Sequence, residues 1–318
     1  MKEGNKKLKL EQIWIDWQSP STHRAFNEAL VALAPVKPRI LYIFSKDLLN
    51  PIVRSKFVNG HQGRFVRAFY IAKLIISHRQ ADILLLTYDP LFLPILNLIP
   101  KKLRVVEHNT TPEIRGQSKH VLWQKIFMRN VSRLTQFPGQ GRRLSELNLR
   151  NRHLGSPLLE NDRWGPRELQ TGFFIAPNSR SCLGDLAKIG ELFGNQPIQI
   201  KGGPQESLNG SQLNLVYVET FDLENYQNIK GIIITISSSI RGSGWFNDAI
   251  TLGIPLIITD KNAQNVFIET FPTYPYVDPL MTSNSEEFEM SLSRVRKFDH
   301  GSYIQAHNEL VGRNLDFM

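Results

Sequence analysis

The chain lacks most features that would mark a disulfide framework, a metal site or a membrane span. Its 318 residues include one cysteine, Cys182, so no internal disulfide can form, which suits a reducing compartment. No two histidines have the spacing of a zinc protease, and we predict no metal site. The most apolar stretch, 81–100, contains Asp82, Asp89 and Pro94, which argues against a transmembrane helix.

Two common nucleotide-binding motifs are also missing. The sequence has no GxxxxGK[ST] loop and no GxGxxG after its first predicted strand, which argues against a P-loop NTPase and a dinucleotide dehydrogenase. The basic N-terminus is followed by no long apolar region, so we expect no signal peptide and a cytoplasmic protein.

Short β-rich runs alternate with helical stretches along the whole chain, which predicts an α/β fold with parallel sheets and crossover helices. Strands are predicted at 12–16, 39–45, 83–87, 104–107 and 134–137, and then at 172–176, 198–200, 213–218, 231–236 and 256–259. Helices are predicted at 24–33, 64–79, 120–131, 182–193, 224–227, 246–252, 286–297 and 303–314. In 64–79, helical spacing places Val66, Phe69, Tyr70, Leu74 and Ile75 on one side, which predicts a core-facing stripe.

A change of charge divides the chain near its middle. Residues 1–158 carry a net charge of roughly +16 and residues 159–318 one of roughly −7. The polar stretch 160–170 falls at the same place and has the composition of a linker. We therefore predict a basic N-terminal domain over 1–158 and a C-terminal domain over 159–318, each Rossmann-like, facing each other across a cleft.

The basic half requires an anionic partner, unless it is simply a solvated surface. Phospholipid headgroups, a lipid-linked pyrophosphate or nucleic acid would serve. Nucleic acid is disfavoured because the aromatic and basic residues are not interleaved as a stacking surface requires. Basic residues also cluster in one predicted loop region, at Arg54, Lys56, His61, Arg64 and Arg67.

The most informative segment is 234–260, where an apolar strand ends in serines up to Ser239 and a helix follows. Gly242, Ser243 and Gly244 precede that helix. Small residues at this point let backbone N–H groups approach a phosphate, and the helix dipole favours the anion. Arg241 could add a charged contact. A tight turn that uses glycine for its geometry alone would explain the pattern equally well.

This segment resembles the donor-binding strand–loop–helix of GT-B-fold glycosyltransferases, particularly those similar to glycosyltransferase family 4. The run from Ala249 through Gly253 and Pro255 to Ile257 matches the family pattern Ala-x-x-x-Gly-x-Pro-x-Ile. Asp248 stands where the family has a Glu that holds the nucleotide ribose. The resemblance implies a nucleotide-sugar donor whose diphosphate is held around Ser239, Gly242, Ser243 and Gly244.

The sequence departs from the family pattern in this loop, where the run Gly242-Ser243-Gly244 resembles a Ser-Gly variant found in related bacterial enzymes, whose backbone amides hold the diphosphate. Arg241 stands near the first of the family's two acidic residues, and the spacing from Arg241 to Asp248 is one residue short. The loop after the first strand of the second domain offers Arg180 to neutralise the leaving diphosphate, with Lys201 as the second choice. Both are equally compatible with ordinary surface cations.

A second segment, 104–113, delivers His108 to the carboxyl end of a strand, where α/β sheets bind their ligands. In similar glycosyltransferases a histidine here touches the donor sugar, which implies that His108 contacts a sugar hydroxyl or serves as a base in an inverting reaction. Glu107 and Glu113 are alternative bases. His108 could also be a hydrogen-bonded loop residue.

Together these residues predict a metal-independent glycosyltransferase that needs no cofactor. It would move a hexose-type sugar from a nucleotide-sugar to a saccharide acceptor, which we expect to be lipid-linked, at the inner membrane face, in cell-surface polysaccharide synthesis. The alternative is a catalytically degenerate GT-B-like protein that binds saccharide or nucleotide as a non-enzymatic subunit, since one acidic residue of the pattern is replaced.

Overall fold

Two compact units make up the chain, each built around its own parallel β-sheet. The first unit contains Met1–Gln136, Gln140–Gly155 and Val311–Met318, and the second contains Phe137–Gly139 and Ser156–Leu310. The computed structural model describes residues 11–16, 24–42, 61–87, 103–108, 131–160, 172–175, 186, 189–201, 213–218, 229–236, 240, 242 and 244–316.

The first sheet has six described strands in the order β2-β1-β3-β4-β5-β6, and all neighbours are parallel. The strands are β1 (Gln12–Asp16), β2 (Arg39–Tyr42), β3 (Asp82–Leu85), β4 (Arg104–Glu107), β5 (Ser132–Thr135) and β6 (Asn151–His153). The strand order reverses between β1 and β3, because the chain first builds outward to β2 and then returns to the other side of β1.

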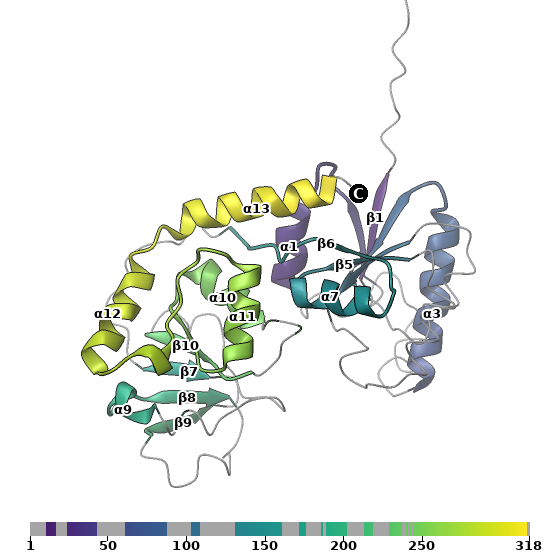
Figure 1. Ribbon diagram of the computed structural model, residues 1–318. Helices are drawn as coiled ribbons and strands as arrows, with labels where there is room; N and C mark the ends of the chain where they lie inside the picture. The colour runs from purple at the N-terminus through teal and green to yellow at the C-terminus, as the bar shows by residue number, and fades with distance from the viewer. Residues whose placement is uncertain are drawn as a thin grey trace, which may run out of the picture. The chain divides into compact units, whose positions relative to one another are not determined.

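Helices cover both faces of this sheet, so alternate strand residues enter two different clusters. Ile13 and Ile15 of β1 pack with Ile71 of α3, whereas Trp14 packs with Leu30 of α1. Helices α1 and α3 accordingly lie on opposite sides of β1 (Figure 1). The described helices of this unit are α1 (Arg24–Ala32), α3 (His61–Ser77), most of α7 (Pro138–Glu146) and the end of α13 (His300–Asp316).

The apolar stripe predicted for α3 is wrong at Phe69. Ile71 and Ile75 are fully buried, but Phe69 is 69% exposed and Ile76 is 58% exposed. Two residues turn a helix by about 200°, so a helix that buries Ile71 must direct Phe69 outward. The outer side of α3 therefore carries two large apolar side chains, with the exposed Lys73 between them in sequence.

The second sheet has the order β11-β10-β7-β8-β9 and is also parallel throughout. Its strands are β7 (Phe173–Ile175), β8 (Ile198–Lys201), β9 (Leu215–Val218), β10 (Gly231–Ile234) and β11 (Leu256–Ile258). The order reverses between β7 and β10, since β8 and β9 extend to one side of β7 while β10 and β11 extend to the other.

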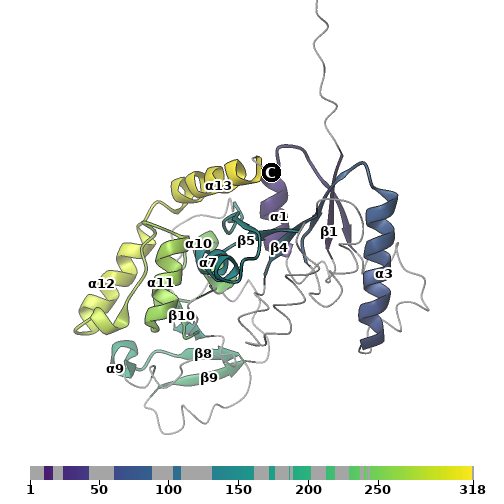
Figure 2. The ribbon, with the colours of Figure 1, turned by 45° about the vertical axis from the view of Figure 1, so that its right-hand side comes forward.

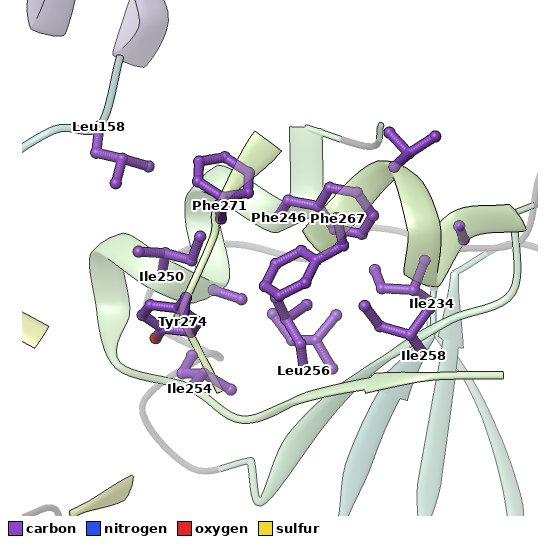
Figure 3. Packing of buried hydrophobic residues seen from close by; sticks show 14 of the residues in the cluster. Leu158, Ile234, Phe246, Ile250, Ile254, Leu256, Ile258, Phe267, Phe271 and Tyr274 are labelled. Carbon is purple, nitrogen blue, oxygen red and sulfur yellow. The ribbon is translucent and has the colours of Figure 1, made fainter. Parts of the chain in front are cut away.

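Helices also cover both faces of the second sheet. Ile234 of β10 and Ile258 of β11 pack with Phe246 of α10 and Phe267 of α11 (Figure 3). On the opposite face, Phe173 of β7 packs with Phe288 of α12, and α9 lies beside β8 and β9 (Figure 2). The helices are α9 (Gly190–Phe193), α10 (Gly244–Leu252), α11 (Lys261–Thr270), η3 (Pro279–Met281), α12 (Ser285–Arg296) and α13 as far as Leu310.

Helix α13 contributes to both units, passing from the second to the first after Leu310. Within the second unit, Asn308 holds the backbone of Leu158, donating from Nδ2 to the carbonyl at 2.8 Å and accepting from the amide at 3.0 Å. His307 Nε2 lies 3.0 Å from the carbonyl of Ser156. These bonds satisfy buried backbone groups of a segment that belongs to no strand.

The predicted α/β class with two parallel sheets is confirmed. The predicted bounds of β1 and β4 match the structure, and α10 begins two residues earlier than predicted. The sequence patterns did not predict β6, α7 or α11. Residues 120–130 of the predicted helix at 120–131, and the whole predicted helix at 224–227, lie outside the described residues. Among the residues that the structure describes, no helix combines the length and apolar character of a membrane span.

Candidate functional site

The carboxyl edge of the second sheet is the first candidate site. In open α/β sheets, ligands bind beyond the carboxyl ends of the strands where the strand order reverses, and that point lies between β7 and β10. The chain leaves β10 at Ile234 and enters α10 at Gly244. Trp245, in the first turn of α10, packs against Phe174 of β7 with ring centroids 4.9 Å apart. The amino end of α10 is thereby held near both strands.

The buried side of α10 fixes this position. Phe246, Ala249 and Ile250 are at most 1% exposed and pack in one cluster with residues of β10 and β11. Figure 3 shows Phe246 beside Phe267 of α11, with ring centroids 5.1 Å apart. The N–H groups in the first turn of an α-helix have no intrahelical acceptor and carry the positive end of the helix dipole. A diphosphate placed there would meet fixed donors.

The two described glycines of the predicted loop differ in their surroundings. A Cβ atom on Gly242 would lie 2.6 Å from a ring carbon of Phe137 and 2.8 Å from the ring of Phe246, so packing alone explains this glycine. A Cβ atom on Gly244 would meet nothing within 4 Å, and Gly244 is exposed. Close packing therefore explains why residue 242 is a glycine. It does not explain the glycine at residue 244, where a larger side chain would fit.

Asp248 is a second unusual feature of α10. Burial raises the pKa of its carboxyl to about 6, and no described residue donates a hydrogen bond or pairs a cation with it. The adjacent Asn247 is engaged instead, with its Nδ2 2.8 Å from Oγ of Ser156 and 3.0 Å from the carbonyl of Pro157. A desolvated carboxylate without a described partner is a candidate for ligand binding, here as an acceptor of hydroxyl hydrogen bonds.

The cations predicted for this site are only partly placed. Lys201 ends β8, the strand next to β7, and is exposed without an ion pair among the described residues. It thus lies at the carboxyl edge of the same sheet. Arg180, Ser239, Arg241 and Ser243 lie outside the described residues, so their roles stay predictions.

The first sheet places His108 directly after β4. Nδ1 of its ring lies 2.8 Å from Nε2 of Gln136, and Phe26 meets the ring edge-on at a centroid distance of 4.9 Å. The neighbouring Glu107 is 1% exposed and pairs with the fully buried Arg133, Oε1 to Nε, at 3.3 Å. Removing one charge of a buried pair leaves the other uncompensated, which favours a role for Glu107 in joining β4 to β5. Glu113 lies outside the described residues.

A polar cluster that the sequence patterns did not predict lies where the strand order of the first sheet reverses, between β1 and β3. Asp16 ends β1 and is fully buried; it accepts hydrogen bonds from Asn27 of α1 at 2.7 Å and from Thr87, just after β3, at 2.6 Å. These bonds tie the carboxyl ends of β1 and β3 to α1. An aspartate that directly follows three buried residues of a predicted strand is the signal that could have revealed it.

No protein-family model matches the sequence, and no curated protein matches it. Solved glycosyltransferase structures share its fold. The Anabaena protein Alr3699/HepE, solved in complex with UDP-glucose, has a TM-score of 0.63 at 10% identity, over 96% of this chain and 100% of its own. A glycosyltransferase from Rickettsia africae ESF-5 has a TM-score of 0.56 at 12% identity, over 96% of this chain and 95% of its own.

These similarities and the two parallel sheets confirm the predicted GT-B fold of two Rossmann-like domains. At such low identities they establish the fold alone. Membership of glycosyltransferase family 4 in particular stays a prediction.

The contrast between the two glycines predicts opposite effects of alanine. Gly242→Ala should lower the free energy of unfolding by about 1–3 kcal/mol, because its Cβ would overlap two aromatic rings. Gly244→Ala should leave that free energy unchanged or raise it by up to about 1 kcal/mol, because alanine favours the helix. Urea denaturation of both variants measures this. Equal losses would show that folding requires Gly244, which would remove its interpretation as space for a ligand.

Asp248 predicts a stability that declines with pH. Its pKa is about 6 in the folded protein and 3.8 for an exposed aspartate, so between these values the folded state binds more protons than the unfolded state. The free energy of unfolding therefore falls as pH rises through this window. Asp248→Asn should remove that decline and raise stability at pH 8 by on the order of 2 kcal/mol. Glu286→Gln, at an exposed carboxylate of α12, should change it by less than about 0.5 kcal/mol. Matching pH profiles for wild type and Asp248→Asn would contradict the assignment.

Proposed function

We propose that the chain is a glycosyltransferase that moves a hexose-type sugar from a nucleotide-sugar to a saccharide acceptor. One observation carries the proposal: the amino end of α10, with open space at Gly244, lies where the strand order of the second sheet reverses. Two structures of the similarly folded HepE contain UDP-glucose and UDP, which supports a nucleotide donor for this chain as well.

In this proposal the donor's diphosphate binds against the first turn of α10. The backbone N–H groups there, with those of Ser243 and Gly244 first among them, hold its oxygens, and Arg180, Lys201 or Arg241 adds positive charge. Fixed donors and cations of this kind lower the barrier because they stabilise the charge that develops on the leaving diphosphate. The carboxylate of Asp248 accepts hydrogen bonds from the ribose hydroxyls.

The desolvation of Asp248 fits this role. Two ribose hydroxyls can donate to one carboxylate, whose two oxygens act only as acceptors in the ionised form. The free protein bears the cost of an ionised carboxylate that no described group pairs, and a bound ribose would offset that cost. The transferred sugar contacts His108. Glu113 is the proposed alternative proton acceptor, because Glu107 forms a buried ion pair with Arg133.

The net positive charge of the first half and the exposed side of α3 support a membrane-bound acceptor. The first half carries roughly +16, and the outer side of α3 combines the exposed Phe69 and Ile76 with Lys73. Apolar side chains flanked by cations suit an anionic membrane surface. We propose that the protein associates peripherally with such a surface and there meets a lipid-linked saccharide, in the synthesis of a surface polysaccharide.

Nucleotide binding is tested by thermal shift with UDP-, GDP-, ADP- and CMP-sugars. We expect one nucleotide class to raise the melting temperature by several degrees, since a ligand at a hundred times its Kd stabilises by about 2.7 kcal/mol. Gly244→Trp should abolish the shift because its indole would fill the space against the first turn of α10. Gly301→Trp is the matched control, since Gly301 is likewise an exposed glycine in the first turn of a helix.

Three outcomes separate the possibilities. No shift with any nucleotide at millimolar concentration would reject the donor site. A shift that survives Gly244→Trp would place the nucleotide elsewhere. A shift without sugar transfer to any acceptor would favour the non-catalytic binding subunit, which the departure at Arg241 from the family pattern already suggests.

Membrane association is tested by sedimentation with vesicles. Wild type should bind vesicles rich in phosphatidylserine but not neutral vesicles, and added salt should weaken the binding. The double change Phe69→Ser and Ile76→Ser should weaken binding roughly tenfold or more, as expected from losing partial burial of two apolar side chains. Met290→Ser with Leu310→Ser, which removes exposed apolar side chains of the second unit, should leave it unchanged. Equal losses in both double variants would reject α3 as the contact surface.

A further inference from the structure

The side-chain amide of Gln136, which the sequence patterns did not indicate, contacts the ring of His108. Gln136, the residue after β5, is 6% exposed, and its Nε2 lies 2.8 Å from Nδ1 of His108. The same Nε2 lies 3.2 Å from the carbonyl oxygen of Glu107. A second buried amide, that of Gln140 in α7, completes the network.

Backbone groups fix the orientation of both amides. The backbone N–H of Gln136 donates to Oε1 of Gln140 at 3.1 Å, so the nitrogen of the Gln140 amide faces Glu107 and donates to its carbonyl at 3.2 Å. The carbonyl of Glu107 can only accept hydrogen bonds. The Gln136 amide must therefore also present its nitrogen there, because an oxygen in that place would face another oxygen.

The tautomer of His108 follows from this orientation. An amide nitrogen donates and does not accept, so Nδ1 of His108 must accept the bond from Gln136. A neutral imidazole has one nitrogen with a lone pair and one with a proton. The lone pair is used at Nδ1, and the proton is on Nε2. Phe26, which also contacts the ring, does so through its aromatic side chain and has no group that could donate a hydrogen bond to Nδ1.

We propose that Gln136 is a positioning residue that fixes His108 as a hydrogen-bond donor through Nε2–H. This inference rests on the proposed function, in which His108 contacts the transferred sugar. His108 then orients an oxygen of that sugar and does not remove the proton of the acceptor hydroxyl, because Nε2 has no lone pair to receive it. The carbonyl of Glu107, held by two glutamine amides, keeps the end of β4 in place for this contact.

The tautomer can be measured directly in the protein without any ligand. A long-range ¹H–¹⁵N spectrum at about pH 8, where an ordinary histidine is neutral, separates protonated from non-protonated ring nitrogens. Comparison with His108→Asn identifies the signals of His108 among the eight histidines. We expect a protonated Nε2 and a non-protonated Nδ1. A protonated Nδ1, or the averaged signals of an unrestrained imidazole, would overturn the proposal.

A pair of variants tests the consequence for catalysis. Gln136→Glu replaces the donor with an acceptor, so the proton should move to Nδ1, and sugar transfer should fall by a factor of about 100 or more. Gln80→Glu introduces the same charge at an exposed glutamine of the first unit, outside this hydrogen-bond network, and should keep the activity. Retained activity in Gln136→Glu, together with a protonated Nδ1, would show that donation from Nε2 is not needed.

Failure of this inference is distinct from failure of the proposed function. The ring spectrum reports on the contact between Gln136 and His108, whereas the nucleotide thermal shift depends on α10. A nucleotide shift together with a protonated Nδ1 would retain the enzyme and reject the role of Gln136. If Gln136→Glu does not fold, the spectrum of the wild-type protein still decides the tautomer.

Discussion

The packing of α10 against the second sheet determines where the candidate diphosphate site lies. Phe246, Ala249 and Ile250 pack one side of this helix against residues of β10, β11 and α11. This packing fixes the direction of the helix. Its amino end consequently lies at the carboxyl edge of the sheet, beside the reversal of strand order. A helix dipole aimed from a rigid support stabilises an anion without reorganisation during the reaction.

The described polar groups at the two sheet edges are arranged differently. In the first sheet, Asp16 accepts hydrogen bonds from Asn27 and Thr87, and Glu107 pairs with Arg133, so both carboxylates have partners within the protein. In the second sheet, Asp248 and Lys201 have no described partner. Lys201 is exposed and solvated, but a buried carboxylate without a partner costs stability, and such groups are candidates for ligand binding. This difference supports the proposal that the charged donor binds at the second sheet.

Elements with strong apolar periodicity could be predicted from the sequence, and polar ones could not. Strand β1 is a buried run, whereas β6 consists of Asn151, Arg152 and His153, at the edge of the sheet, and has no apolar alternation. Helix α7 contains two glycines in its first turns, and glycine opposes a helix prediction. Helix α11 did carry a signal, since Asp260 caps it by accepting from the amide of Ala263. Asp248 and the loop before α10 could be singled out because they resemble a family pattern, whereas Gln136 could not, because it adjoins His108 only across neighbouring strands.

The most direct test of the central claim is the crystal structure of the protein with UDP bound. We expect electron density for the diphosphate within hydrogen-bonding distance of the backbone nitrogen of Gly244, and for the ribose beside the carboxylate of Asp248. A diphosphate bound away from the amino end of α10 would contradict the account, whatever the nucleotide's affinity.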